Sequence, residues 1–476
     1  MVDDDKLPPH RLIGLVAGPL VFTALLALPA PAGLSADGWT TATVGAWMAL
    51  WWMTEATALA VTALLPLILF PLLGIRGLDE TAQAYANPLI FLFLGGFLLA
   101  RAMRVWTLDR RLALAVLGLA GAHPARVVGG IMAVTAFLSM WVSNTATAMV
   151  MLPIGLSVVA LFAEQKDAKL PPALLLGIAY AATIGGMGTI IGTPPNALFV
   201  GFMAESYGIE IGFAQWMLVG VPLVCVLLPL AWLVLTRVCF RLGDDAAPAV
   251  AAAIATQRAG LAPISRAEVM VAVLMVLVAV CWLFRPLLNA FVPLSDAGIA
   301  MTGAALLFVL PADLKRGRFL LHWDEAMTIR WDVLILFGGG LALAGAIGAS
   351  DLAGWIGERL AGFDALPAWA LLLALGILIV LVGELASNTA MAAVFLPVAG
   401  AAALAMGEPA VTLTLPIALF ATLGFMLPVA TPPNAVIFGS GAVKMGHMLR
   451  AGAILDAVGI VVVAIGVLTL GRWVLG

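Results

Sequence analysis

Long apolar runs separated by short polar or charged segments fill most of the chain. A helix that spans a membrane needs about 20 apolar residues, and runs approaching that length recur from one end of the chain to the other. The pattern predicts crossings over Ile13–Leu28, Trp39–Thr54, Ala58–Ile75, Pro88–Ala100, Pro171–Ile191 continued after a break by Pro194–Met203, Phe213–Phe240, Val269–Phe284, Ala297–Leu310, Val333–Ala349, Ala410–Val429 and Ile454–Leu475. We therefore expect an all-α, polytopic membrane protein.

Two further apolar runs contain a polar triplet. Ser143-Asn144-Thr145 lies near the middle of Val127–Ala163, and Ser387-Asn388-Thr389 lies within Leu366–Met406. The first run is too long for one crossing and slightly short for two, so it forms either a re-entrant hairpin or two full helices. Irregular polar backbone at membrane depth is tolerated only where it faces protein or a water-filled cavity. The triplets are therefore the first candidates for a binding site.

Three motifs occur twice, in the same order and at nearly one offset. They are Leu92–Gly96 with Leu336–Gly340, the triplet at Ser143 with the triplet at Ser387, and Thr193-Pro194-Pro195-Asn196 with Thr431-Pro432-Pro433-Asn434. Such recurrence indicates a duplicated chain. Each half has five crossings plus a hairpin run that adds none or two, and this odd number inverts the second half relative to the first.

The repeat predicts the following organisation. Residues 1–38 form an N-terminal helix and loop, 39–241 the first inverted repeat, 242–265 a cytoplasmic linker and 266–476 the second inverted repeat. The re-entrant hairpins are expected at about 124–163 and 366–406, and the broken helices at about 172–206 and 410–442.

Composition supports a membrane protein and excludes other classes. Of 476 residues, 63% are hydrophobic and 10% charged, whereas soluble proteins carry about 25% charged residues. A net charge of −3 gives no reason to expect nucleic acid as a partner. The 3 cysteines and 4 histidines show no ligand spacing, so we expect no cofactor other than a coupling ion.

Positive charge predicts the orientation in the inner membrane. With a cytoplasmic N-terminus and an external C-terminus, the 23 lysines and arginines fall inside except for Arg76, Arg285, Arg359 and Arg472. This is the bias that cytoplasmic loops show. The first hairpin then enters from the cytoplasm and the second from the opposite side.

The triplets favour anion binding. Ser, Asn and Thr cap helix N-termini, and the unpaired N–H groups of a first helical turn attract an anion. The tips could hold an anionic substrate without a lysine or arginine at membrane depth, where charge is costly. A lone triplet would more simply indicate helix–helix hydrogen bonding, but its recurrence in both halves favours a site.

Cation ligands are predicted on the other side of each tip. Ser139 lies one turn before Ser143, and the last carbonyls of the first arm lack helix partners. In the facing motif, proline removes N–H donors, so Thr193 is expected to cap a half-helix that begins at Pro194. Free carbonyls near Gly192 and Ala430 would complete shells suited to Na⁺.

Two acidic residues at membrane depth are further candidates. Glu384 precedes the second triplet, and Glu55 separates two crossings. Such acids are functional suspects, although Glu55 could equally end a helix at the interface.

These paired motifs resemble those of the divalent anion/sodium symporter family, which includes bacterial and animal di- and tricarboxylate carriers. The resemblance covers nearly the whole chain after the first helix. It implies 11 transmembrane helices, two re-entrant hairpins, a homodimer, and an elevator mechanism in which a transport domain moves against a scaffold.

The resemblance also implies roles for individual residues. Substrate carboxylates would contact Ser143, Asn144, Thr145, Ser387, Asn388, Thr389, Thr431 and Pro433. One Na⁺ would lie among Ser139, Ser143, Asn144 and Gly192, and a second among Gly383, Ala386, Asn388 and Ala430. Gly383 departs from members that carry threonine there, so a hydroxyl ligand is lost.

The leading hypothesis is Na⁺-driven import of a C4-dicarboxylate such as succinate, malate or fumarate. A sodium-independent exchanger of dicarboxylates or citrate, which Gly383 favours, and a sulfate transporter of the same family are the alternatives. An intramembrane enzyme would need a catalytic partner for Glu384, and the sequence places no second acid, histidine pair or metal-ligand set beside it. A channel is a further alternative, but inverted repeats with broken helices favour alternating access.

Overall fold

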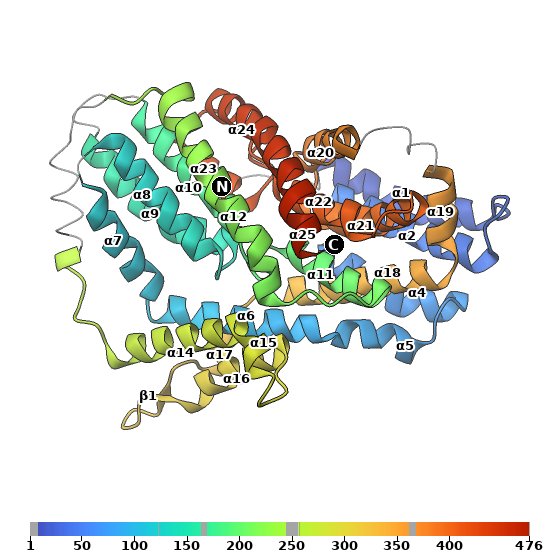
Figure 1. The fold of residues 1–476 in the computed structure, drawn as a ribbon, viewed down its shortest axis with the longest axis horizontal. Coiled ribbons are helices and arrows are strands. Elements are labelled where there is room, and N and C mark those ends of the chain that lie inside the picture. Colours follow the sequence, from blue (N-terminus) through green and yellow to red (C-terminus); the bar gives the residue numbers. More distant parts are fainter. Residues whose placement is uncertain are drawn as a thin grey trace.

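The computed structural model describes residues 8–121, 123–162, 169–243, 256, 258–360 and 368–475, and most of them are helical (Figure 1). Parts of the predicted organisation lie outside the described residues. They are residues 1–7 of the N-terminal segment, residue 163 at the end of the first hairpin, residues 366–367 at the start of the second, residues 244–255 and 257 of the linker, and residues 122, 164–168, 361–365 and 476 elsewhere in the two repeats.

The first half of the chain is a succession of apolar helices. Its elements are α1 (Pro9–Leu26), α2 (Ala36–Thr54), α3 (Leu59–Thr62), α4 (Leu65–Leu73), α5 (Leu78–Gln83), the 3-10 turn η1 (Ala84–Ala86), α6 (Pro88–Val105), α7 (Leu108–Ala120), α8 (Pro124–Ser139), α9 (Asn144–Phe162), α10 (Leu170–Gly186), α11 (Pro194–Tyr207), α12 (Phe213–Leu233) and the π-helix η3 (Val234–Cys239).

The second half of the chain is also mostly helical. It contains α14 (Arg266–Leu283), α15 (Arg285–Leu288), α16 (Asp296–Val309), β1 (Pro311–Asp313), β2 (Arg318–Phe319), α17 (Trp323–Ala326), α18 (Trp331–Ala349), α19 (Leu352–Leu360), α20 (Ala368–Gly383), α21 (Asn388–Ala405), α22 (Val411–Thr422), α23 (Pro432–Gly439), α24 (Met445–Gly466), the π-helix η5 (Val467–Gly471) and α25 (Arg472–Val474).

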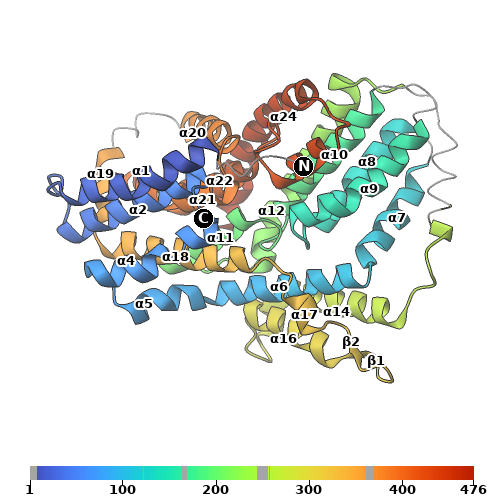
Figure 2. The same ribbon diagram turned by 180° about the vertical axis from the view of Figure 1, so that it is seen from behind.

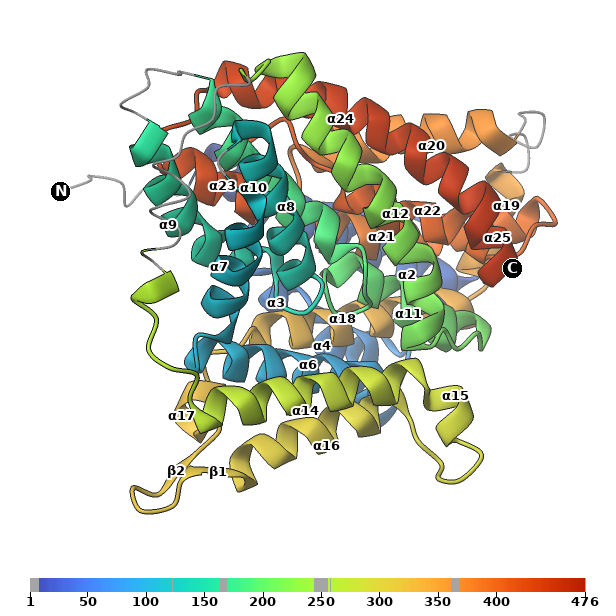
Figure 3. The ribbon, with the colours of Figure 1, turned by 60° about the vertical axis from the view of Figure 1, so that its left-hand side comes forward.

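Helices from the two halves exchange packing partners. The helix pairs α8–α9 and α20–α21 lie toward opposite ends of the molecule (Figure 3). Helix α11 of the first half packs against α21, and α23 of the second half packs against α9. The second segment of each broken helix therefore packs against a helix of the other half that begins at a triplet. This packing brings the recurring motifs together.

The length and apolar composition of its helices make this chain a multi-pass membrane protein. Within the described residues, seven helices are long and apolar enough to cross a membrane, and further apolar helices of 10–17 residues accompany them. Helix α10 is buried along nearly its whole length, whereas α14 exposes Val273, Val276 and Leu277. A helix apolar on all sides is suited to a buried or a lipid-facing position, so α10 lies in the core and α14 on the periphery.

Two peripheral groups of helices flank the centre. Helices α5, α6, α14 and α16 run along one face (Figure 1). Seen from behind, α2 lies beside α18 and α19, and α1 packs against α2 (Figure 2).

One small element departs from the all-α expectation. Strands β1 and β2 pair antiparallel, with Pro311 opposite Phe319. The Asp313 carboxylate accepts the N–H of Lys315 at 3.0 Å, and Gly317 adopts a positive φ of 62°. An Asx turn followed by a left-handed glycine reverses the chain, which folds the basic loop into a hairpin.

Candidate functional site

Both polar triplets lie where one helix ends and the next begins. Helix α8 ends at Ser139 and α9 begins at Asn144, and Ser143 Oγ accepts the N–H of Ala146 at 3.4 Å as a cap. In the second half α20 ends at Gly383 and α21 begins at Asn388. Ser387 occupies the N-cap position without a side-chain cap bond. The predicted hairpin tips therefore coincide with the triplets.

The broken helices begin their second segments at the predicted prolines. Helix α11 starts at Pro194 with Thr193 as an extended N-cap, and α23 starts at Pro432 with Thr431 as its N-cap. Only Thr431 uses its side chain, which accepts the N–H of Asn434 at 3.3 Å. The fixed φ of proline suits the first position of a helix.

The first segment of each broken helix ends several residues before the position that the prolines alone predict. Helix α10 ends at Gly186, where the sequence predicted helix to Ile191. The reason is Asn196, whose Nδ2 donates to the Gly186 carbonyl at 3.0 Å and to the Thr189 carbonyl at 2.8 Å. Buried carbonyls need hydrogen-bond partners, and the asparagine supplies them once the helix has unwound.

The second break repeats this arrangement. Helix α22 ends at Thr422, and Nδ2 of Asn434 donates to the carbonyls of Gly424 at 3.1 Å and Leu427 at 3.0 Å. The asparagine in both Pro-Pro-Asn motifs could have predicted the early helix ends, because an asparagine at the third helical position can donate to carbonyls in the preceding unwound segment.

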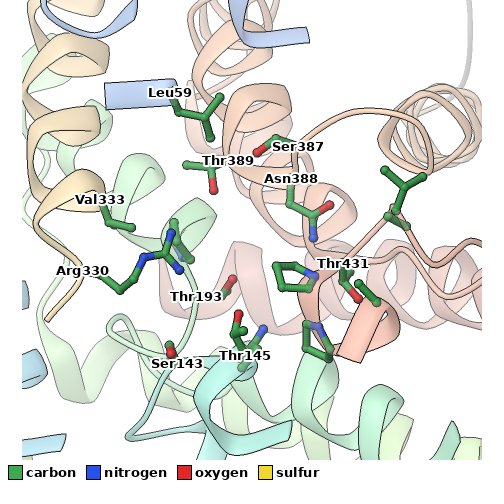
Figure 4. Close-up of a pocket in the computed structure, with 18 of the residues that line it drawn as sticks. Leu59, Ser143, Thr145, Thr193, Arg330, Val333, Ser387, Asn388, Thr389 and Thr431 are labelled. Atoms are coloured by element: carbon green, nitrogen blue, oxygen red, sulfur yellow. The ribbon is translucent and has the colours of Figure 1, made fainter. Parts of the chain in front are cut away.

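Residues of both triplets and of both broken helices line one cavity of about 470 Å³. Ser143 and Thr145 approach it at the start of α9, and Ser387, Asn388 and Thr389 approach it at the start of α21. Thr193 and Thr431 lie between these two groups (Figure 4). The first residues of α9, α11, α21 and α23, namely Asn144, Pro194, Asn388 and Pro432, all belong to its lining. Four helix N-termini therefore meet at a single cavity.

Two charged residues also line this cavity. Glu55 ends α2 in a left-handed conformation with φ 46° and forms an ion pair of 2.8 Å with Arg11, so it is both a helix end and a cavity residue. Arg330, beside α18, extends toward the cavity (Figure 4) and forms an ion pair of 2.7 Å with Asp332. Sequence reasoning missed Arg330, because its position before a crossing resembles an ordinary interfacial arginine.

Oxygen atoms converge behind the first tip. Ser139 Oγ lies 2.7 Å from both Asn144 Oδ1 and the Ala182 carbonyl oxygen. Turned about its terminal bond, the Asn144 amide would donate to the carbonyls of Gly192 at 3.2 Å and Ala182 at 3.1 Å. With Oδ1 facing these atoms instead, four oxygens form a cluster that a hard cation would stabilise. Ser139, Asn144 and Gly192 are thus brought together, and Ala182 was not foreseen.

Glycine permits this close approach. A Cβ on Gly186 would lie 2.5 Å from Asn144 Oδ1, and a Cβ on Gly192 would lie 2.4 Å from the Gly186 carbonyl oxygen. Both separations are far below ordinary contact, so a side chain at either position would displace the cluster.

Fewer of the predicted cation ligands come together behind the second triplet. Asn388 Oδ1 is buried without a hydrogen-bond partner among the described residues, and it lies with Ala430 beside Gly424. Gly383 and Ala386 are buried in the turn before Asn388 but do not line the cavity. A buried amide oxygen without a donor is compatible with a cation ligand.

Glu384 links the second tip to its break. Its carboxylate accepts the N–H groups of Met426 at 2.9 Å and Leu427 at 2.7 Å. In the first half, the Thr189 hydroxyl donates to the Met140 carbonyl at the corresponding place. The role of Glu384 in this geometry is to hold the unwound segment.

Comparison with known proteins places these features in a family. The family model described as "Sodium:sulfate symporter transmembrane region" matches residues 10–476. A protein of Staphylococcus saprophyticus named "Sodium-dependent dicarboxylate transporter SdcS" is 39% identical over 479 residues, covering 98% of this chain and 92% of the relative. Its namesake in Staphylococcus aureus (strain USA300) is 38% identical with the same coverage.

A solved structure also resembles the fold. The YdaH transporter of Alcanivorax borkumensis aligns over 98% of both chains with a TM-score of 0.57 and 13% sequence identity.

Proposed function

The chain belongs to the sodium:sulfate symporter family, and from this membership we propose that it uses Na⁺ to import C4-dicarboxylates such as succinate, malate and fumarate. Members of this family are membrane transporters rather than enzymes. Relatives that cover nearly the whole chain are named sodium-dependent dicarboxylate transporters.

The meeting of four helix N-termini at one cavity carries the proposal. The N-termini of α9 and α21 present unpaired N–H groups. Helices α11 and α23 begin with two prolines, which have no N–H, so they contribute only the partial positive charge of the helix dipole. Asn144, Pro194, Asn388 and Pro432 open those helices at the cavity. A volume of about 470 Å³ is within the range of small-molecule sites, about 300–1,000 Å³. A small dianion is the ligand that this field and this size favour.

The two triplets would each take one carboxylate. Ser143, Asn144 and Thr145 offer hydroxyl and amide donors on one side, and Ser387, Asn388 and Thr389 offer the same set on the other (Figure 4). Thr431 and Pro433 line the cavity between them and would flank the substrate.

Two Na⁺ sites would lie behind the tips. The first would use Ser139, Ser143, Asn144 and Gly192, with the Ala182 carbonyl as an added candidate because it adjoins Ser139 and Asn144. The second would use Gly383, Ala386, Asn388 and Ala430, supported by the unpartnered Asn388 Oδ1.

The helices support 11 crossings with two re-entrant hairpins in inverted repeats. The proposed crossings are α1, α2, α3–α4, α5–α6, α10–α11, α12–η3, α14, α16, α18, α22–α23 and α24–η5. Helix α17 and the basic β-hairpin lie at one end of the molecule, and α15, α19 and α25 lie at the other (Figure 3). The first end would face the cytoplasm of an inner membrane, with the N-terminus inside and the C-terminus outside.

We further propose an elevator mechanism in a homodimer. The mutual packing of α11 with α21 and α23 with α9 would let both hairpins and both broken helices move as one transport domain. Helix α14, with its exposed apolar side chains, would belong to the scaffold in lipid or against a second copy.

Succinate uptake into proteoliposomes tests the proposal. Radiolabelled succinate should accumulate faster with external Na⁺ than with K⁺ or choline, and empty liposomes provide the control. Uptake no faster than in empty liposomes under every ion condition would exclude dicarboxylate transport by this protein.

Exchange without Na⁺ is the second candidate, because Gly383 supplies no hydroxyl to the second site. In that case external Na⁺ would be without effect, and uptake would require dicarboxylate loaded inside the vesicles.

The Gly383→Thr substitution is expected to strengthen Na⁺ coupling. A Cβ at Gly383 would meet nothing within 4 Å, and this residue has no positive φ, so threonine fits and adds a hydroxyl ligand. We expect the Na⁺ concentration for half-maximal uptake to fall several-fold, about 1 kcal/mol in binding. Gly383→Val has nearly the same shape without the hydroxyl and should leave it unchanged. Equal effects of threonine and valine would mean that position 383 does not ligate Na⁺.

A further inference from the structure

A groove between α6 and α9 leads away from the substrate cavity. Phe97, Arg101 and Arg104 follow one another at helical spacing on α6, and Met149, Pro153 and Ser157 do so on α9. Residues three or four apart lie on one face of a helix. The two facing stripes enclose a cavity of about 450 Å³ that Thr107 and Arg110 complete.

This groove is linked to the substrate cavity by shared lining residues. An intermediate cavity of about 210 Å³ shares Ser143, Thr145 and Arg330 with the substrate cavity. The same intermediate cavity shares Arg101 and Arg104 with the groove. A path of three adjoining cavities therefore lies between the first triplet and the junction of α6 and α7, at the end of the molecule that holds α17 (Figure 3).

Two arginines of the groove, Arg101 and Arg104, form no salt bridge within the described residues, unlike Arg330, which pairs with Asp332. Arg101 Nε donates to the Glu325 carbonyl at 3.2 Å, and Arg104 has no salt bridge within the described chain. Asp109, the one acid of the groove lining, is buried and accepts the N–H of Arg110 at 2.7 Å. Positive charge is thus in excess along the groove.

Electrostatics around Asp109 agree with this geometry. Burial raises the pKa of its carboxyl, the N–H of Arg110 and the charge of Arg104 lower it, and the balance is upward. Since no described residue forms a salt bridge with Arg104, its guanidinium keeps its capacity to attract another anion.

We propose that Arg101, Arg104 and Arg110 form an arginine vestibule, a low-affinity anion station through which the dicarboxylate passes between the substrate cavity and the cytoplasm. The proposal rests on the proposed function. A charged cleft raises the local concentration of an oppositely charged ligand and its on-rate by about 10–10³-fold. When the dianion leaves the two triplets for water at the cytoplasmic side, the vestibule would offset part of the free energy lost with its contacts in the substrate cavity.

An anionic lipid headgroup shares this chemistry. The position beside the triplet cavity favours the dicarboxylate, because a site for lipid alone does not need an adjoining cavity lined by Ser143 and Thr145.

Oriented membrane vesicles test the vestibule. In inside-out vesicles, where external substrate meets the cytoplasmic face, Arg104→Gln should raise the KM for succinate at least about threefold at low salt. In right-side-out vesicles the KM should not change, and high salt should reduce the difference. Arg104→Lys keeps the charge and should restore the parent value.

Arg316→Gln is the matched control. Arg316 is 87% exposed in the turn between β1 and β2, lies outside the linings of all three cavities and loses the same charge, so its KM should equal that of the parent from either face. Arg110→Gln, at an exposed position of the vestibule, provides a second variant if Arg104→Gln is poorly produced.

The outcomes separate the two proposals. Equal KM values for Arg104→Gln and Arg316→Gln, with an active parent, would overturn the vestibule alone. No uptake by the parent from either face would overturn the proposed function and the vestibule with it. Succinate counterflow in proteoliposomes of phosphatidylcholine should retain the Arg104→Gln defect, whereas a defect confined to proteoliposomes with added phosphatidylglycerol would identify a lipid site and overturn the proposal.

Discussion

Replacing Asn144 with alanine is expected to abolish Na⁺-driven uptake, reducing it by at least about 100-fold. The Asn144 amide lies 2.7 Å from Ser139 Oγ and approaches the Gly192 carbonyl across the break. It would serve one Na⁺ and one substrate carboxylate at once. A hydrogen bond to a charged group contributes about 1.5–3 kcal/mol. Losing one such bond to the carboxylate, together with a contact of similar size between the amide oxygen and Na⁺, costs at least about 3 kcal/mol, or two orders of magnitude in binding.

Uptake and Na⁺ titration in proteoliposomes measure this effect. Asn289→Ala is the matched control, because Asn289 lies exposed after α15, away from the cavity, where its Oδ1 accepts the N–H of Leu294 at 2.9 Å. The control should transport like the parent. Near-normal Na⁺-dependent uptake by Asn144→Ala would remove this residue from both binding sites.

Alanine at Gly186 is expected to silence transport while the protein still folds. Its Cβ would lie 2.5 Å from Asn144 Oδ1 and 2.9 Å from Nδ2, so the amide must leave the oxygen cluster. Overpacking costs about 1–3 kcal/mol. Because the obstructed atoms end a side chain rather than belong to the backbone, we expect the displacement to appear mainly as about 10- to 100-fold weaker Na⁺ activation.

The repeat supplies an internal control for this substitution. Gly424 occupies the matching position in the second half, where a Cβ would lie 3.3 Å from Ala430 Cβ and 3.9 Å from Asn388 Oδ1. Gly424→Ala should therefore impair transport much less. Thermal unfolding in detergent checks that both variants are folded. Similar Na⁺ activation in the two variants would show that the close approach of Gly186 to Asn144 is not required.

The membrane class and the positions of the tips could be predicted because they depend on local sequence. Apolar runs specify helices by length alone. Proline at the first position of a helix needs only its own fixed φ, and α11 and α23 accordingly begin at Pro194 and Pro432. The triplets interrupt their runs, and the helices α9 and α21 begin there.

The ends of the broken helices could not be predicted in the same way. Sequence reasoning continued the first helix to Ile191, but the Asn196 side chain satisfies the Gly186 and Thr189 carbonyls and lets the helix end sooner. An unwound segment is stable only when partners for its carbonyls are in place. Those partners are set by side-chain geometry, which hydropathy does not report.

Sequence by itself determined that this chain crosses a membrane many times and carries the same polar motifs in each half. Tertiary structure alone decided that four helix N-termini open into one cavity, that Ala182 adds a carbonyl beside Ser139, and that Arg330 faces the cavity. The physical reason is the range of the interactions. Helix formation and capping act within a few residues, whereas the site arises from packing α11 against α21 and α23 against α9, across the two halves of the chain.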